Sequence, residues 1–187
     1  MRARQIFTGL ALALAPATQA DCAPTQPAIR MVVSPAALPG RSATPVIFLG
    51  GSIDNGSANN WQADLVAALS DQTAIILNPR REEWNPAWRN DAADPHFREQ
   101  VEWELAGLER ADIIVMYLAP GTQSPVSLLE LGLHARSGKV VLYCPDGFWR
   151  KGNVDLTAIK YHVTQVRDFA GLVGELRKRI HKNRPAS

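Results

Sequence analysis

The chain alternates between short continuous apolar runs and segments whose apolar residues recur every three or four positions. The runs are typical of strands buried on both faces, and the periodic segments of amphipathic helices. We expect strands at residues 45–49, 73–77, 113–118 and 140–144, and a weaker one at 161–166. This alternation predicts a single α/β domain, doubly wound in the flavodoxin or Rossmann manner, with about five mostly parallel strands and helices on both faces.

The ends of the chain differ from its centre. A basic start followed by a short apolar stretch and small residues predicts a signal peptide at residues 1–20, and therefore a secreted or periplasmic protein. The alternative is an Ala-rich leader on a cytoplasmic protein, and N-terminal sequencing of the mature protein distinguishes the two. Residues 21–43 are rich in Pro, Ala and Ser, which predicts a linker without a core of its own. The folded domain is expected at 44–181, before a basic tail at 182–187.

Composition narrows the possible partners. A net charge of +2 and a pI of about 8.7 are too mild to indicate binding of a nucleic-acid polymer. No stretch reaches the roughly 20 apolar residues that a membrane span needs. The four His and two Cys residues are scattered, without the spacing of a metal site, so neither a metal nor another cofactor is expected.

Unusual residues gather where the predicted strands end. Ligands of open α/β sheets bind beyond the carboxyl ends of the strands. The segments expected there are Gly50-Gly51-Ser52-Ile53-Asp54, Asn78-Pro79-Arg80-Arg81, the loop at 119–127 and Pro145-Asp146-Gly147. The two glycines permit the close backbone approach that suits a sugar or a phosphate. A strand-terminating turn would explain them equally well. Their spacing is not that of the dinucleotide-binding fingerprint.

Glu130 is the first candidate for chemistry. It is the only charged residue between positions 113 and 135, and it lies among leucines. A carboxylate in apolar surroundings costs several kcal/mol of desolvation, which active sites commonly accept. A capping box that starts at Ser127 would be a structural explanation. Pro125 favours a different frame, in which Ser124 is the N-cap and Glu130 lies in the second turn, beyond capping reach.

Glu104 is the second candidate. It falls on the apolar stripe of a predicted helix, a stripe formed by Phe97, Val101, Leu105 and Leu108, while Trp103 is expected to point away from it. A glutamate in this position is often paired with an arginine, and Arg80 or Arg81 would serve. The other interpretation is a second carboxyl group of an active site.

Residues 46–163 resemble the nucleoside 2-deoxyribosyltransferase family and the related deoxynucleotide N-hydrolases. The resemblance rests on Phe-Leu-Gly-Gly-Ser-Ile at 48–53, a glutamate eight positions before Asp112, and the strand that Asp112 begins. The most specific motif is Leu-Glu-Leu-Gly-Leu-His-Ala at 129–135, which leads to Gly-Lys and a strand. The segments at 78–81 and 97–104, together with Trp84, look like a subfamily described only as deoxyribosyltransferase-like.

This resemblance implies a chemistry. Glu130 matches the family's nucleophile, which attacks the anomeric carbon, expels the base and forms a covalent glycosyl intermediate that water or another base resolves. A second carboxyl group protonates the departing base and then activates the acceptor. Glu104 matches that position, where the family carries an aspartate, so this chain departs from the family by one methylene.

The resemblance also bears on substrate and assembly. Six residues before the nucleophile, the transferases carry Asp and the nucleotide hydrolases carry Ser. This chain has Ser124, which favours a nucleotide over base exchange between nucleosides. The implied substrate-binding residues are Gly50, Gly51, Ser52, Asn78, Arg80, Ser124 and Ser127. Family members usually form homodimers and complete each other's sites. The alternative function is a non-catalytic nucleotide-binding or sensing module whose site has drifted.

Overall fold

The computed structural model describes residues 28–53, 59–81, 85 and 87–183. The signal peptide predicted at residues 1–20 therefore lies outside the described residues, as do Trp84 and most of the predicted basic tail.

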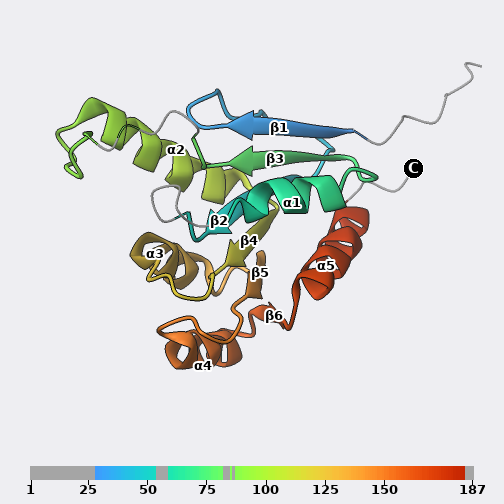
Figure 1. Ribbon diagram of the computed structural model, residues 1–187. Helices are drawn as coiled ribbons and strands as arrows, with labels where there is room; N and C mark the ends of the chain where they lie inside the picture. Colours follow the sequence, from blue (N-terminus) through green and yellow to red (C-terminus); the bar gives the residue numbers. More distant parts are fainter. Residues whose placement is uncertain (1–27, 54–58, 82–84, 86, 184–187) are drawn as a thin grey trace, which may run out of the picture.

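Six strands and five helices make up the described part of the chain (Figure 1). The strands are β1 (Ile29–Val33), β2 (Val46–Gly51), β3 (Ala74–Asn78), β4 (Ile113–Tyr117), β5 (Val140–Tyr143) and β6 (Thr164–Val166). The helices are α1 (Trp61–Ala68), α2 (Pro95–Arg110), α3 (Pro125–His134), α4 (Lys151–Tyr161) and α5 (Phe169–Lys182). The strands form one parallel sheet in the order β1-β3-β2-β4-β5-β6, which confirms the doubly wound α/β fold.

The sheet has an apolar core on each face, because successive side chains of a strand point to opposite sides. In β2, Ile47 and Leu49 pack in the cluster that includes α1 and α5. Val46 and Phe48 pack in the opposite cluster, which includes α2, α3 and α4. All four side chains are fully buried, and this is why the central strand is a continuous apolar run in the sequence.

The predicted linker at 21–43 is wrong in part, because residues 29–33 form strand β1. This strand pairs in parallel with β3 along its whole length, from Ile29 opposite Ala74 to Val33 opposite Asn78. Its Val32 is only 5% exposed. The prediction failed because β1 is an edge strand, whose short apolar run is hidden among Pro and Ala residues.

Residues 34–40 follow β1, and we call them the strap. They run along α2, where the indole Nε1 of Trp103 donates a hydrogen bond of 2.7 Å to the carbonyl of Ala36. Arg110 donates to the carbonyls of Pro39 and Gly40 at 3.1 and 2.7 Å. The strap is thus tied to the domain by hydrogen bonds.

Helix α4 was not predicted either. Only Val154 and Ala158 are buried in it, while Leu156 and Ile159 are 70% and 69% exposed, so its apolar pattern does not show one clear face. Among the described helices, none has both the length and the apolar character that crossing a bilayer requires.

The buried position of β1 leads to a stability prediction. We expect Val32→Asp to lower the free energy of unfolding by at least about 3 kcal/mol, because it places an unpaired carboxylate in the core. Met31→Asp is the matched control, since its side chain is 48% exposed, and its effect should be much smaller. Urea unfolding of both variants measures the difference, and equal losses would contradict the place of β1 in the core.

Candidate active site

A cleft of about 860 Å³ lies beyond the carboxyl ends of β2 and β4. The chain leaves β2 for β3 on one side, while β4 pairs with β2 on the other, so the strand order reverses between β2 and β4. Such switch points leave a crevice in which α/β proteins bind ligands, and the volume is within the usual range of ligand sites. The walls come from the ends of β2 and β3, one side of α2, the loop after β4 and the start of α3.

Glu130 reaches this cleft from the second turn of α3. Helix α3 begins with Pro125 at N1 and has Ser124 as its N-cap, so the capping box starting at Ser127 is excluded. Glu130 is only 6% exposed, and its carboxyl group accepts no hydrogen bond from any residue that the structure describes. The structural explanation for this buried charge therefore fails.

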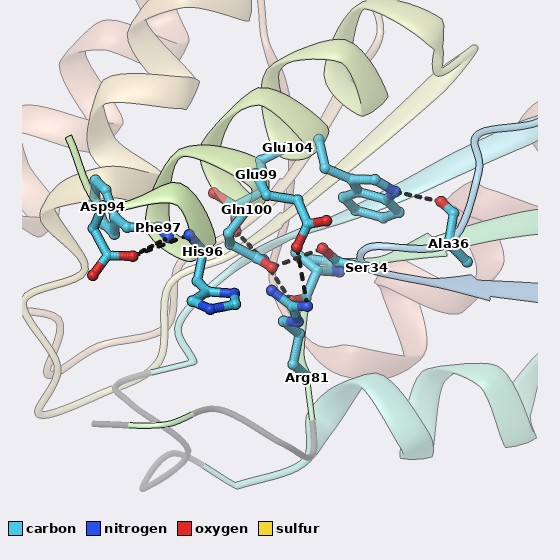
Figure 2. Close-up of polar contacts among 11 residues, drawn as sticks. Ser34, Ala36, Arg81, Asp94, His96, Phe97, Glu99, Gln100 and Glu104 are labelled. Carbon is cyan, nitrogen blue, oxygen red and sulfur yellow. Dashed lines mark hydrogen bonds and ion pairs between the residues drawn. The ribbon is translucent and has the colours of Figure 1, made fainter. Parts of the chain in front are cut away.

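Glu104 lines the same cleft from α2. Its Oε1 accepts a hydrogen bond of 2.8 Å from Nε2 of Gln100 (Figure 2). The suggested pairing with an arginine is not found: Arg81 forms its ion pair with Glu99, at 3.4 Å, and no arginine of the described chain is ion-paired with Glu104. Two carboxyl groups from different helices thus face one cleft.

Burial raises the pKa of both carboxyl groups. Burial, and then the charge of Glu104, raise the pKa of Glu130 to about 8. Burial also raises the pKa of Glu104, and the hydrogen bond from Gln100 opposes that rise. Two coupled carboxyl groups of this kind release their protons in two steps that belong to the pair. The pair therefore retains a proton at neutral pH.

The face of α2 that is buried differs from the predicted stripe. Its buried residues are Gln100, Trp103, Gly107 and Leu108. Leu105 is 44% exposed, while Phe97 and Val101 line the cleft. The stripe was wrong because α2 packs under both the sheet and the strap: Trp103 lies against Phe48, with ring centroids 6.3 Å apart, and also bonds to the strap.

Gly50 and Gly51 line the cleft, but strand packing is the reason that the chain needs glycine there. They pair with Met116 and Tyr117 of β4. Gly51 has φ 135°, and a Cβ on it would fall on the backbone of Tyr117. Their backbone forms the floor between β2 and β4.

A cluster of three hydroxyl groups supports one wall. Oγ of Ser52 lies 2.8 Å from Oγ1 of Thr122 and 2.6 Å from Oγ of Ser124, and it accepts a bond of 2.9 Å from the N–H of Ala119. Ser52 is fully buried beneath the cleft, whereas Thr122 and Ser124 line it. Ser124 has φ 44°, an uncommon conformation outside glycine that often marks functional sites.

The remaining predicted binding residues separate into two groups. Arg80 and Ser127 line the cleft. Asn78 does not, because its Oδ1 accepts a 3.0 Å hydrogen bond from the N–H of Arg80 and closes the turn after β3. Asn78 therefore shapes the site without facing it.

Sequence analysis placed Arg81 at this end of the sheet without counting it among the substrate-binding residues, and it missed the aromatic side chain of Trp88. The Arg81 guanidinium lies 5.2 Å from the ring centroid of Trp88, and both residues line the cleft. Nη1 of Arg81 is buried and has no hydrogen-bond partner in the described chain, so it can donate to a ligand. The place of Arg81 directly after the predicted binding residue Arg80 was the available signal for a binding role.

Comparison with known proteins identifies the family of this chain. Residues 44–148, more than half of the chain, match the family model described as "nucleoside 2-deoxyribosyltransferase like". The chain belongs to this family. Both glutamates and the cleft-lining residues lie within the matched region, whereas the strap lies outside it.

A solved structure shows the same fold. It is the crystal structure of a conserved protein from Enterococcus faecalis V583, with a TM-score of 0.50 and 16% identity, and the match covers 73% of this chain and 99% of that one. None of the curated proteins matches the chain. Within the described residues, no three His, Cys, Asp or Glu side chains gather in a way that would hold a metal ion.

The raised pKa of Glu130 predicts how stability depends on pH. Between its ordinary pKa of 4.5 and about 8, the folded protein holds this proton more tightly than the unfolded chain does. The contribution to stability is therefore complete below pH 4.5 and is lost as the pH rises through about 8. We expect Glu130→Gln to reduce this loss of unfolding free energy with rising pH. The difference from wild type should be at most a few kcal/mol.

Urea unfolding at a series of pH values tests this expectation. Glu102→Gln, in which an exposed glutamate of α2 is changed, is the control and should leave the wild-type slope unchanged. If Glu130→Gln and wild type had the same slope, the cleft would not bury the Glu130 carboxyl group.

Proposed function

We propose that this protein cleaves the N-glycosidic bond of a nucleoside or nucleotide through a covalent glycosyl intermediate on Glu130. The observation that carries the proposal is the pair of carboxyl groups, of buried Glu130 and half-buried Glu104, facing one cleft at the switch point of the sheet. Membership of the family supports the same general chemistry. A pair that shares a proton supplies at once the nucleophile and the acid that glycosyl transfer needs.

In the first step the Glu130 carboxylate attacks the anomeric carbon of the sugar. The bond from that carbon to the base nitrogen breaks, its electrons go to the base, and Glu104 donates its proton there. The pair retains one proton at neutral pH, and the productive form is the one with the proton on Glu104 and the charge on Glu130.

In the second step the ester on Glu130 is resolved. Water, or the nitrogen of a second base, attacks the anomeric carbon while ionised Glu104 takes the proton of the attacking group. The carboxylate of Glu130 leaves and is regenerated. Water gives a hydrolase and a second base gives a transferase, and the two carboxyl groups have the same roles in both.

The cleft favours a nucleotide among the possible substrates. Its wall at the start of α3 carries Thr122, Ser124 and Ser127, and the first turn of that helix contains no acidic residue. Hydroxyl groups and helix N–H groups bind phosphate, whereas a carboxylate would repel it. Arg80 and Arg81 line the same cleft and add positive charge.

Base release from a panel of nucleosides and nucleotides tests the proposal. We expect wild type to release free base, Glu130→Gln to abolish release, and Glu104→Gln to slow it by at least about a hundredfold. A 2-fluoro-sugar analogue should leave an adduct on Glu130 that mass spectrometry detects. The exposed variant Glu102→Gln should retain wild-type turnover.

One further variant, assayed with the same panel of nucleosides and nucleotides, tests substrate choice. Ser124→Asp should lower activity on 5′-nucleotides and spare activity on nucleosides, because it places a carboxylate near the phosphate. Wild type that binds a nucleotide tightly and releases no base would overturn the enzymatic proposal in favour of the sensing module.

We also propose that two copies of the chain pair through α3. Its Val126, Leu129 and Leu133 are 57%, 63% and 60% exposed and recur at helical spacing, so they form an apolar stripe on the side opposite the core. Pairing is also what the family resemblance implies.

Sedimentation velocity tests this pairing. We expect wild type to sediment as a dimer and the double variant Leu129→Glu/Leu133→Glu to sediment as a folded monomer, because two charges would be buried at the interface. Met31→Glu, which changes an exposed apolar residue on the edge strand, should remain dimeric. Monomeric wild type would overturn the proposal.

A further inference from the structure

Gln100 connects the strap to Glu104 through hydrogen bonds that engage its whole amide group. Nε2 donates to the carbonyl of Pro79 at 2.9 Å and to Oε1 of Glu104 at 2.8 Å. Oε1 of Gln100 accepts from the hydroxyl of Ser34 at 2.7 Å (Figure 2). If Nε2 and Oε1 of Gln100 exchanged places, the amide oxygen would face two acceptors, the carbonyl of Pro79 and Oε1 of Glu104. The network therefore determines the orientation of the Gln100 amide.

Ser34 is held firmly enough to define that orientation. It is 5% exposed, and its N–H donates to the carbonyl of Asn78 at 3.2 Å. Two residues further on, the carbonyl of Ala36 accepts the 2.7 Å bond from Trp103. Ser34 and Gln100 are both buried, and Gln100 lies one helical turn before Glu104 on α2.

We propose that Ser34 and Gln100 are positioning residues that hold Oε1 of Glu104 as a fixed acceptor, so that Oε2 carries the proton to the base and back. This inference rests on the proposed function and deepens it. Because Oε1 accepts the amide hydrogen, the proton resides on Oε2. In the first step the Oε2–H bond breaks and an N–H bond forms on the departing base. In the second step Oε2 takes a proton from the acceptor.

The charged groups around Glu104 are few. Glu130 faces it from α3, Arg80 and Arg81 line the same cleft after β3, and Glu99 of α2 is ion-paired with Arg81. Gln100 makes the hydrogen bond to Glu104 that stabilises its ionised form, in opposition to burial. Weakening that bond should raise the pKa of Glu104 further.

Kinetics of Ser34→Ala and Gln100→Met test the positioning role. We expect kcat to fall about tenfold and about a hundredfold respectively, with KM within about twofold, because proton transfer is impaired and binding is not. The limb of the pH profile that reports loss of the Glu104 proton should move to higher pH by about one unit. Trp103→Phe is the matched control: it removes a different hydrogen bond between the strap and α2, and should lower Tm without moving that limb.

A second measurement does not depend on turnover. Carbon-13 NMR of the full chain with labelled glutamate follows each carboxyl group, and Glu104→Gln identifies the signal of Glu104. Its midpoint should rise in Ser34→Ala and Gln100→Met and stay unchanged in Trp103→Phe. If all three variants behaved alike, or if an active wild type and Ser34→Ala shared one profile and one midpoint, the positioning role would be refuted. If wild type released no base, the proposed function would fail, while the titration would still decide the role of Ser34 and Gln100.

Discussion

The close approach of β2 and β4 is the constraint on which the site depends. Gly51 lies so near the backbone of Tyr117 that a Cβ does not fit, and the next residue, Ser52, donates its N–H to the Tyr117 carbonyl at 2.8 Å. The hydroxyl of Ser52 then accepts from Ala119 and contacts Ser124, the N-cap of α3. The end of β2 thereby holds the loop that follows β4, and the conformation of that loop determines where α3 begins.

The carboxyl pair follows from this arrangement. Once Ser124 is the N-cap, Glu130 lies in the second turn of α3 and is turned into the cleft. Helix α2 lies on the same face of the sheet and brings Glu104 to the opposite wall. The charge of Glu104 raises the cost of ionising Glu130 in a poorly solvated space, and this repulsion favours the retention of one proton by the pair.

The strap adds a layer that the family-matched region does not contain. It closes over α2, buries Ser34 and Gln100, and reaches the Glu104 carboxyl through hydrogen bonds. This explains why a glutamine, which seldom occupies the buried face of a helix, is found there. The segment between β1 and β2 therefore bears on the proposed chemistry as well as on stability.

The sequence by itself determined the fold class, four of the strands with nearly correct bounds, and the two glutamates that meet in the cleft. Strong apolar periodicity and a charge isolated among leucines are local properties, and they can be found without knowing what is packed nearby. Pro125 was enough to decide the frame of α3, because proline strongly favours the first turn.

Only the tertiary structure decided that β1 joins the sheet, that Asn78 and Ser52 support the cleft instead of lining it, and that Gln100 in place of an arginine contacts Glu104. The place of β1 and the position of Ser52 depend on residues far apart in the chain, and so does the orientation of the Gln100 amide, which Ser34 holds from 66 residues away. An edge strand pairs with one neighbouring strand only, and its sequence need not show a long apolar run. A buried amide is held by single hydrogen bonds to donors and acceptors, and these leave no periodic pattern in the sequence. The physical reason is that periodicity records which face of an element is buried, and it does not record which residue covers that face.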